Sequence, residues 1–195
     1  MKKYMFPSLK LTFLLIVICG LGYPILITAI SKMAPGGGKG IRIEANGRVV
    51  GYSNIGQRFN QDGYFWGRPS AVDYNANGSG GSNKGPTSED LIKVVEARAD
   101  SFIKHNPGVK KGEIPSDLIT ASGSGLDPDI SIEGAIIQIP RVARVRNLSL
   151  SAVDSLVHQN AEGPLFGLFG PSKVNVLKLN LALNSLDSPN KKPTN

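Results

Sequence analysis

The sequence predicts an α+β protein in which one N-terminal transmembrane helix precedes a single mixed α/β domain. The segment Leu11–Ser31 contains no charged side chain. An Asn46-Gly47 dipeptide joins two strand-like segments, and later segments carry apolar residues at helical spacing. Of the 195 residues, those that follow the apolar segment are enough for one core but too few for two large domains. Hairpin, helices and isolated strands in mixed order are typical of α+β folds.

The apolar segment 11–31 is long enough to cross a membrane as a helix. At about 1.5 Å of rise per residue it reaches about 30 Å, the thickness of a bilayer's hydrocarbon core. A cleaved signal peptide is the alternative, because Lys2 and Lys3 precede the segment and Ala29–Ser31 resembles a cleavage site. We favour a retained anchor, since the apolar residues continue past Pro24. Charge alone leaves the orientation of the helix open.

The net charge of +7 does not indicate a nucleic-acid partner. Lys2, Lys3, Lys10 and Lys32 flank the apolar segment, where basic residues are expected beside lipid headgroups, and the remaining surface is close to balanced. Cys19 is the only cysteine and lies inside the apolar segment. An intramolecular disulfide and a thiolate metal site are therefore excluded.

Composition divides the chain into five parts. Residues 1–10 precede the transmembrane helix 11–31, and the glycine-rich segment 32–40 is expected to be a flexible joint. Residues 41–187 form the predicted domain. Residues 188–195, which are polar, are expected to be a disordered tail.

The first elements of the domain are a β-hairpin and a long loop. Residues 41–45 and 48–52 are predicted strands, because Asn46-Gly47 suits the positive φ angles of a two-residue hairpin turn. From Asp73 to Pro86 the chain offers almost nothing to bury, so a loop is expected.

A helix follows the loop, with Thr87 as its predicted cap and Asn106-Pro107-Gly108 at its end. Its apolar face is expected to carry Leu91, Val94, Val95 and Phe102. Residues 117–121 are predicted to form a short strand.

The C-terminal part of the chain is predicted to alternate between helices and a strand. Ile132 to Ile139 recur at helical spacing until Pro140 kinks or breaks the helix, and Ser149 or Ser151 caps the next one. Val174–Leu177 alternates as a strand does. The residues Leu179, Leu183 and Leu186 have helical spacing.

No catalytic residue is predicted. Ser122 and Ser124 lie among glycines but lack the pattern of a nucleophile elbow. His105 and His158 are on expected helix ends, where histidines are usually surface residues. A membrane-anchored hydrolase using Ser122 or Ser124 is therefore the weakest of the functional hypotheses.

One loop is a candidate binding site for a nucleotide or another anion. The chain has no P-loop, yet closely spaced backbone N–H groups in a serine-glycine loop can form an anion nest. A plain surface loop is the alternative interpretation. The residues of this candidate site are Ser79, Gly80, Gly81, Ser82 and Asn83.

No metal site is predicted, although Asp127-Pro-Asp129 begins like a calcium loop. Ile132 stands where such a loop needs glycine, so Asp127 or Asp129 is expected to cap the following helix instead. Arg141, Arg144 and Arg146 are predicted to form a basic patch that binds lipid phosphate, a nucleotide or a partner's carboxylates. A solvated helix face is the alternative.

Several segments, taken in order, closely resemble the C subunit of the bacterial Kdp high-affinity potassium-transporting ATPase. The match covers nearly the whole chain, and its specificity comes from the order and spacing of the pieces. They are Gly56–Phe59, Tyr64–Ala71, Ser79–Asn83, Thr120–Pro128, Gln138, Arg141–Ala143, Arg146, Val174–Leu177 and Asn180–Leu183.

The resemblance implies a non-catalytic, single-pass subunit of a potassium import complex in the bacterial inner membrane. The implied partners are a channel-like potassium-selecting A subunit, a P-type ATPase B subunit, a small single-pass F subunit and membrane lipid. It also implies a cytoplasmic N-terminus and an extracytoplasmic domain.

The resemblance further implies a catalytic chaperone that raises the ATP affinity of the B subunit. No intrinsic cofactor is expected, and ATP would be shared with the ATPase subunit at the loop near Gly80 and Gly81. Because a domain outside the cytoplasm rarely meets ATP, we favour assembly and gating at the extracellular mouth of the potassium pathway. The alternative function is a free-standing binding module for anionic lipid or polymer that works through Arg141, Arg144 and Arg146.

Overall fold

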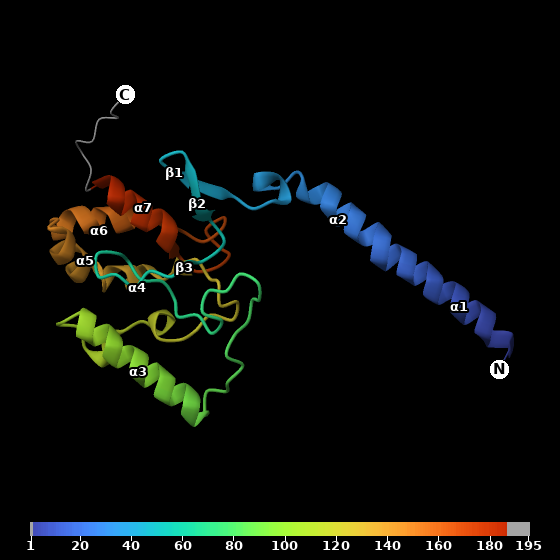
Figure 1. Ribbon diagram of the computed structural model, residues 1–195, viewed down its shortest axis with the longest axis horizontal. Coiled ribbons are helices and arrows are strands. Elements are labelled where there is room, and N and C mark those ends of the chain that lie inside the picture. The colour runs from blue at the N-terminus through green and yellow to red at the C-terminus, as the bar shows by residue number, and fades with distance from the viewer. Residues whose placement is uncertain (1, 187–195) are drawn as a thin grey trace. The chain divides into compact units, whose positions relative to one another are not determined.

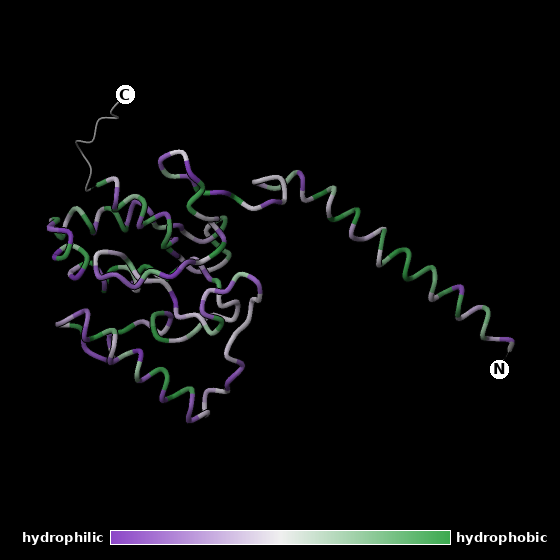
Figure 2. Tube along the Cα trace, viewed as in Figure 1, coloured by the Kyte–Doolittle hydropathy of each residue, from purple (hydrophilic) through white to green (hydrophobic). Residues whose placement is uncertain are grey.

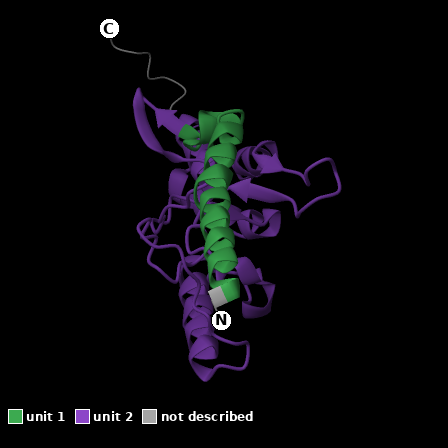
Figure 3. Cartoon of the chain, turned by 90° about the vertical axis from the view of Figure 1, so that its right-hand side faces the viewer, with its two compact units in different colours: residues 1–42 green, residues 43–195 purple. Residues whose placement is uncertain are grey.

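The computed structural model describes residues 2–186 and divides the chain into two compact units (Figure 3). The first unit is Met1–Arg42 and the second is Ile43–Asn195. The predicted tail 188–195 lies outside the described residues.

The first unit is mainly one long apolar helix (Figures 1 and 2). It comprises α1 (Lys2–Val17), a π-helical turn (Ile18–Gly22) and α2 (Tyr23–Ser31). Residues Lys3–Ser31 have the length and composition of a membrane span, with a mean hydropathy of 2.5 over an 18-residue window. The predicted apolar helix is therefore present, and its helical winding begins at Lys2. The bounds 11–31 of the membrane span stay a prediction.

The π-helical turn lies directly before Pro24. The Tyr23 N–H donates to the carbonyl of Ile18, five residues back, instead of to Cys19. Proline has no N–H to donate and its ring crowds the preceding turn, so a wider turn accommodates it without ending the helix. Pro24 thus changes the local winding of the helix but does not divide it.

The glycine-rich segment after the helix forms a turn. A 3₁₀ turn spans Pro35–Gly38, and Gly36, Gly37 and Gly38 all have positive φ angles. Glycine adopts this backbone conformation without steric cost. The flexibility expected of residues 32–40 stays a prediction.

The predicted β-hairpin is present as β1 (Arg42–Ala45) and β2 (Arg48–Tyr52). Asn46 has a φ of 52° and Gly47 a φ of 71°. Both central residues are therefore in the left-handed region, as a type I′ turn requires.

Helix α3 (Glu89–His105) ends at Asn106 as predicted, but two details of the prediction are wrong. The N-cap residue is Ser88 rather than Thr87, and the Ser88 carbonyl accepts the first helical hydrogen bond from Ile92. Val94 is exposed, because only the C-terminal half of α3, with Ala99 and Phe102, packs on the core. The N-terminal half extends beyond it (Figure 1).

The strand predicted at residues 117–121 is wrong. A 3₁₀ turn spans Ser116–Leu118, after another at Lys111–Glu113. The Asp117 carboxylate accepts hydrogen bonds from the Ser131 N–H at 2.7 Å and the Ser131 hydroxyl at 3.1 Å. This side chain ties the turn to the start of the next helix, and an extended strand would break the contact.

Pro140 divides two helices, α4 (Ile132–Ile136) and α5 (Ile139–Arg146). It lies in the first turn of α5, where a backbone N–H would have no acceptor within the helix, so its absence costs α5 no hydrogen bond. The predicted break is thus confirmed. The cap of α4 is Ser131, whose hydroxyl accepts from Gly134 at 2.9 Å, so the expected capping by Asp127 or Asp129 is wrong.

Helix α6 (Leu150–Gln159) is capped by Ser149, one of the two predicted residues. A small antiparallel sheet has the order β3–β5–β4, with β3 at Asp129–Ile130, β4 at Ala161–Glu162 and β5 at Lys173–Asn175. Helix α7 (Val176–Leu186) starts directly after β5, so Val176 and Leu177 are helical rather than extended.

The core of the second unit lies between α3 and a layer formed by the other helices. Helix α6 packs against α4, α5 and α7. The extended segment 56–70, called the core segment below, runs between this layer and α3 (Figure 1). Phe65 of the core segment is fully buried, and Trp66 contacts Phe102 of α3 edge to face with 6.3 Å between ring centroids. The core segment therefore joins the two sides of the domain.

Candidate functional site

Arg141 is a buried structural residue, which corrects the predicted basic patch. Its side chain is 2% exposed. The guanidinium donates to Asn106 Oδ1 at 2.9 Å, to Gln138 Oε1 at 2.6 Å, and to the carbonyls of Asp62 at 2.5 Å and Tyr64 at 2.9 Å. Burial lowers the pKa of Arg141 to about 10, so the group stays protonated at neutral pH. Its positive charge is therefore bonded to acceptors inside the protein and is not available to a partner.

The other two arginines of the predicted patch differ in their surroundings: Arg146 makes contacts within the domain, and Arg144 faces solvent. Arg146 donates to the Gly63 carbonyl at 2.7 Å and to Asn184 Oδ1 at 3.0 Å, and its guanidinium lies 4.4 Å from the centroid of the Tyr64 ring. Only Arg144 is exposed. An amphipathic helix of eight residues cannot direct all three side chains to solvent while Val142 and Ala143 face the core. The three arginines therefore do not form one exposed basic surface, which the hypothesis of a binding module for anionic lipid or polymer requires.

The predicted anion loop, residues 79–83, packs against the segment Ser122–Gly125. The Gly80 N–H donates to the Ser124 carbonyl at 2.9 Å, and the Ser79 hydroxyl donates to the same carbonyl. A Cβ atom on Gly125 would lie 2.7 Å from the Gly80 carbonyl oxygen. The N–H of Gly80 is thus already bonded within the domain. Nucleotide binding by Ser79, Gly80, Gly81, Ser82 and Asn83 stays a prediction.

The side chains considered for hydrolysis are held in separate structural contacts. Ser122 is buried, and its hydroxyl accepts a hydrogen bond from the Gly125 N–H at 2.9 Å. The Ser124 hydroxyl accepts from the Leu126 N–H. His105 contacts Asp62 at 2.8 Å, and His158 contacts the Asp154 carbonyl at 3.0 Å. The hydroxyl groups of the two serines therefore stabilise the turn before Leu126 by accepting its backbone hydrogen bonds.

The two aspartates of the calcium-like sequence are paired with cationic side chains. Asp127 contacts Arg68 at 3.0 Å, and Asp129 contacts Lys173 at 2.5 Å. These pairs link the core segment to the start of β3, and β3 to β5. Among the described residues, no group of three or more His, Cys, Asp or Glu side chains is placed to hold a metal ion.

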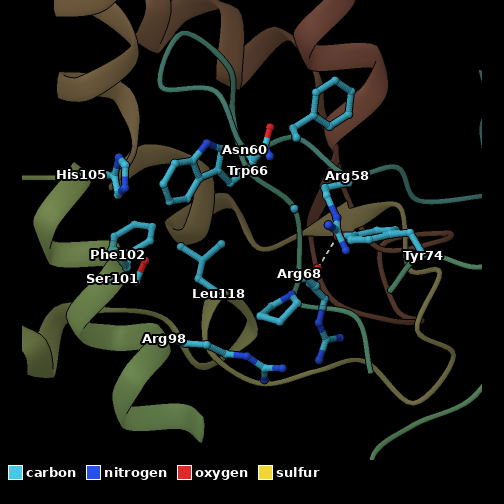
Figure 4. A pocket seen from close by; sticks show the side chains of 13 residues that line it. Arg58, Asn60, Trp66, Arg68, Tyr74, Arg98, Ser101, Phe102, His105 and Leu118 are labelled. Atoms are coloured by element: carbon cyan, nitrogen blue, oxygen red, sulfur yellow. Dashed lines mark hydrogen bonds between the residues drawn. The ribbon is translucent and has the colours of Figure 1, made fainter. Parts of the chain in front are cut away.

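A cavity of about 330 Å³ lies between the core segment, Tyr74, α3 and Leu118 (Figure 4). Trp66, Phe102 and His105 form one wall, while Arg68 and Arg98 lie on another side (Figure 4). The Trp66 ring contacts His105 with 5.0 Å between centroids. The lining residues are Arg58, Phe59, Asn60, Trp66, Gly67, Arg68, Pro69, Tyr74, Arg98, Ser101, Phe102, His105 and Leu118.

The charge of the cavity lining is positive. Three guanidinium groups line the cavity, and no aspartate or glutamate is among the lining residues. Arg58 pairs with Asp73 and Arg68 with Asp127, both outside the lining, whereas Arg98 donates to the Ile119 carbonyl at 3.1 Å. Arg68 Nε is buried and has no hydrogen-bond partner among the described residues. An anion with an apolar or aromatic body matches this lining.

Tyr74 connects the cavity to the serine-glycine loop. Its hydroxyl donates to the Arg68 carbonyl, and Val72, two residues earlier, contacts the Gly80 position. Burial raises the pKa of the Tyr74 hydroxyl, so this donor keeps its proton at neutral pH. The predicted loop therefore lies next to the segment that carries Tyr74, and none of its residues lines the cavity.

The sequence did not reveal the cavity, because its lining comes from three separate parts of the chain. Arg98 appeared only as a polar position of the predicted helix. The one signal was the density of aromatic and arginine residues between Arg58 and Tyr74 in segments with no periodic pattern. Such density indicates packing as readily as binding.

These observations define a protein with one apolar helix long enough to span a membrane and an α+β domain whose buried polar side chains hold its fold. A family model described as the K+-transporting ATPase, c chain (KdpC), matches residues 5–185. The chain belongs to this family.

Curated relatives match over nearly the full length. The potassium-transporting ATPase KdpC subunit of Flavobacterium psychrophilum is 54% identical over 184 residues, which is 94% of this chain and 99% of that protein. The KdpC subunit of Phocaeicola vulgatus is 45% identical, with 93% of this chain and 97% of that protein covered. The KdpC subunit of Caldanaerobacter subterraneus is 46% identical, covering 90% and 92%.

Proposed function

We propose that this chain is a non-catalytic, single-pass subunit of an ATP-driven potassium import complex, in which another subunit hydrolyses ATP. The observation that carries the proposal is the family match over residues 5–185, which includes both the helix and the domain. The relatives that share this full length bear the name of a potassium-transporting ATPase subunit.

The proposed partners are a channel-like potassium-selecting A subunit, a P-type ATPase B subunit and a small F subunit. Among the side chains first considered for chemistry, Arg141, Asp127 and Ser122 are engaged in internal contacts. What the domain offers to partners is therefore its surface and its fixed shape. This supports a role in assembly and gating.

We further propose a cytoplasmic N-terminus and an extracytoplasmic domain in the bacterial inner membrane. The candidate span Lys3–Ser31 is apolar throughout its centre, and its two lysines, Lys3 and Lys10, lie in its first third. Lysines at the first turns favour the cytoplasmic side, but Lys32 directly follows the span, so the proposed orientation rests on the family resemblance rather than on charge.

A catalytic chaperone role, in which this chain raises the ATP affinity of the B subunit, is proposed as an effect transmitted through the assembled complex. Two places in the domain are candidates for an anion, namely the loop 79–83 and the cavity. The cavity has the better geometry, since the Gly80 N–H is already bonded and Arg68 Nε is not.

The test is to express the other subunits of the complex with and without this chain. With it, we expect the chain to co-purify with the two large subunits and potassium to stimulate ATP hydrolysis. Without it, potassium-stimulated hydrolysis should be lost, and the remaining subunits should show a higher KM for ATP if any activity persists. Full potassium-stimulated activity in the complex lacking this chain would end the proposal.

A further inference from the structure

A charge-free loop between β4 and β5 carries a cluster of exposed apolar side chains. Residues 163–172 contain no charged residue. Leu165 is 64% exposed, Phe166 83%, Leu168 80% and Phe169 66%. Single exposed apolar residues are ordinary, but four of them at one tight turn mark a contact surface.

The backbone of this loop is closed on itself. Leu165 and Phe169 exchange both of their backbone hydrogen bonds, at 2.8 and 3.0 Å. The Gly167 N–H donates to Pro164 at 2.9 Å, and the Leu168 N–H donates to Leu165 at 3.2 Å. Pro164 and Pro171, at the two ends, have no N–H. Few polar backbone groups of the loop therefore need water.

The loop is also preformed. Phe166, Gly167 and Gly170 have φ angles of 55°, 71° and 86°, which reverse the chain within a few residues. The apolar side chains are thus presented without ordering the loop upon contact, and binding costs little conformational entropy.

The rest of the chain favours lipid as the occupant. The candidate span Lys3–Ser31 holds the chain to a membrane, and the segment 32–42 between the span and the domain can extend to about 40 Å at most. The anchor therefore keeps the domain within reach of the bilayer surface. Entry into a bilayer is favoured by internally bonded backbone and an absence of charge; the loop has no charged residue, and the N–H groups of Leu165, Gly167, Leu168 and Phe169 are bonded within it.

We propose that the loop 163–172 inserts Leu165, Phe166, Leu168 and Phe169 into the interface of the membrane that holds the anchor. The domain then has a second, reversible attachment to lipid besides its helix. This attachment limits the orientations in which the domain can meet partner subunits. The proposal rests on the membrane anchoring stated above.

The test uses the full chain alone in vesicles of phosphatidylethanolamine and phosphatidylglycerol. Cys19→Ser removes the native cysteine, and Leu168→Cys then accepts an environment-sensitive fluorophore at the loop tip. The matched control is Asn77→Cys in the same background, since Asn77 is also exposed on a loop but has polar neighbours. We expect nitroxide-labelled lipids to quench the label at position 168 and aqueous iodide to quench the label at position 77.

Two results would overturn the proposal. One is a label at position 168 that iodide reaches as readily as the label at 77. The other is a label that is shielded only after the complete complex is reconstituted, because the occupant would then be a protein groove. A separate sample labelled at the native Cys19 reports on the helix. If Cys19 is shielded but position 168 is not, the loop proposal fails while the anchor stands; if Cys19 is exposed, the anchor itself has failed.

Discussion

The guanidinium of Arg141 lies 4.4 Å from the centroid of the Trp66 ring, and both residues bond to the same amide of Gln138. Gln138 Oε1 accepts from the Trp66 N–H at 2.8 Å, and its Nε2 donates to the Trp66 carbonyl at 3.2 Å. Asn180 pairs with the backbone of Phe65 in the same way. Side-chain amides thus take the place of neighbouring strands for the core segment, and Arg141 fixes one of them.

Arg141→Met is expected to lower the free energy of unfolding by about 3 kcal/mol, because four acceptors, two of them buried, lose the guanidinium, and among the described residues only Gln138 Oε1 keeps another donor, the Trp66 N–H. Arg141→Lys should recover little of this, since an ammonium cannot reproduce the planar fork. Urea unfolding of the detergent-solubilised chain, followed by circular dichroism, measures the change. Arg144→Met, on the exposed face of α5, is the control and should change stability by less than about 0.5 kcal/mol. Equal effects of the two variants would contradict this role for Arg141.

Gly56→Ala is expected to destabilise the domain by about 1–3 kcal/mol. A Cβ atom at this position would lie 2.4 Å from the Asp127 carbonyl oxygen, and backbone cannot rotate away as a side chain can. The Gly56 N–H also donates to the Leu126 carbonyl at 2.7 Å, so the two segments are held at this distance. Gly112→Ala is the matched control, because nothing lies within 4 Å of its added Cβ. Thermal unfolding of the two variants should differ in midpoint, and a Gly56→Ala midpoint equal to that of Gly112→Ala would refute the close approach.

Arg98→Gln should weaken polyphosphate binding by about 10- to 150-fold if the cavity holds the anion, since one charge-assisted hydrogen bond is worth about 1.5–3 kcal/mol. ATP serves as the probe, titrated calorimetrically into the full chain. Gly80→Ala tests the predicted loop, because its Cβ would make only an ordinary contact with Val72 at 3.5 Å. We expect Gly80→Ala to leave the affinity unchanged. The reverse pattern, with loss in Gly80→Ala and none in Arg98→Gln, would assign the anion to the loop 79–83.

The pair of Lys173 and Asp129 is expected to stabilise the small sheet in a pH-dependent way. The hydrogen bond to Asp129 raises the pKa of Lys173 above 10.5 in the folded chain. The charged form therefore favours folding, and its contribution is complete below pH 10.5 and disappears as the pH rises through the raised pKa. Because 45% of the Lys173 side chain is exposed, the contribution is below about 1 kcal/mol.

Lys173→Met is the variant that measures this contribution. The difference in unfolding free energy between the native chain and the variant should be constant near neutral pH and should vanish at strongly alkaline pH. Lys93→Met, which removes an exposed charge 3.8 Å from Glu89, reports the general effect of losing a lysine. A difference for Lys173→Met that stays the same across the alkaline range would show that the ion pair does not stabilise the fold.

The hairpin, the helix breaks and the Ser149 cap were predictable because each depends on neighbours in sequence. Asn46-Gly47 prefers positive φ angles in any protein, and Pro140 cannot lie inside a helix without breaking it. The strand predicted at 117–121 was wrong for the opposite reason. Its conformation depends on a bond between Asp117 and Ser131, and no local pattern indicates such a partner.

The candidate site could be predicted only in part. The serine-glycine loop was visible as a sequence motif, but the bond from Gly80 to Ser124 was not. The basic patch was predicted from charge on a short helix, whereas burial of Arg141 depends on acceptors supplied by Asp62 and Tyr64, far away in the chain. Arginine on a helix is exposed by default unless the rest of the fold surrounds it with acceptors.

The sequence by itself determined the apolar helix, the α+β class and the family. Hydropathy and turn residues are local features of the sequence, and the family follows from the order of its motifs. Only the tertiary structure decided which charged side chains are buried and bonded inside the domain and which are exposed at its surface. Arg141 and Arg144 are three positions apart in one helix, yet one is buried beneath Trp66 and the other faces solvent. The physical reason is that the cost of burying a charge is offset only by partners that the folded chain brings together from distant positions.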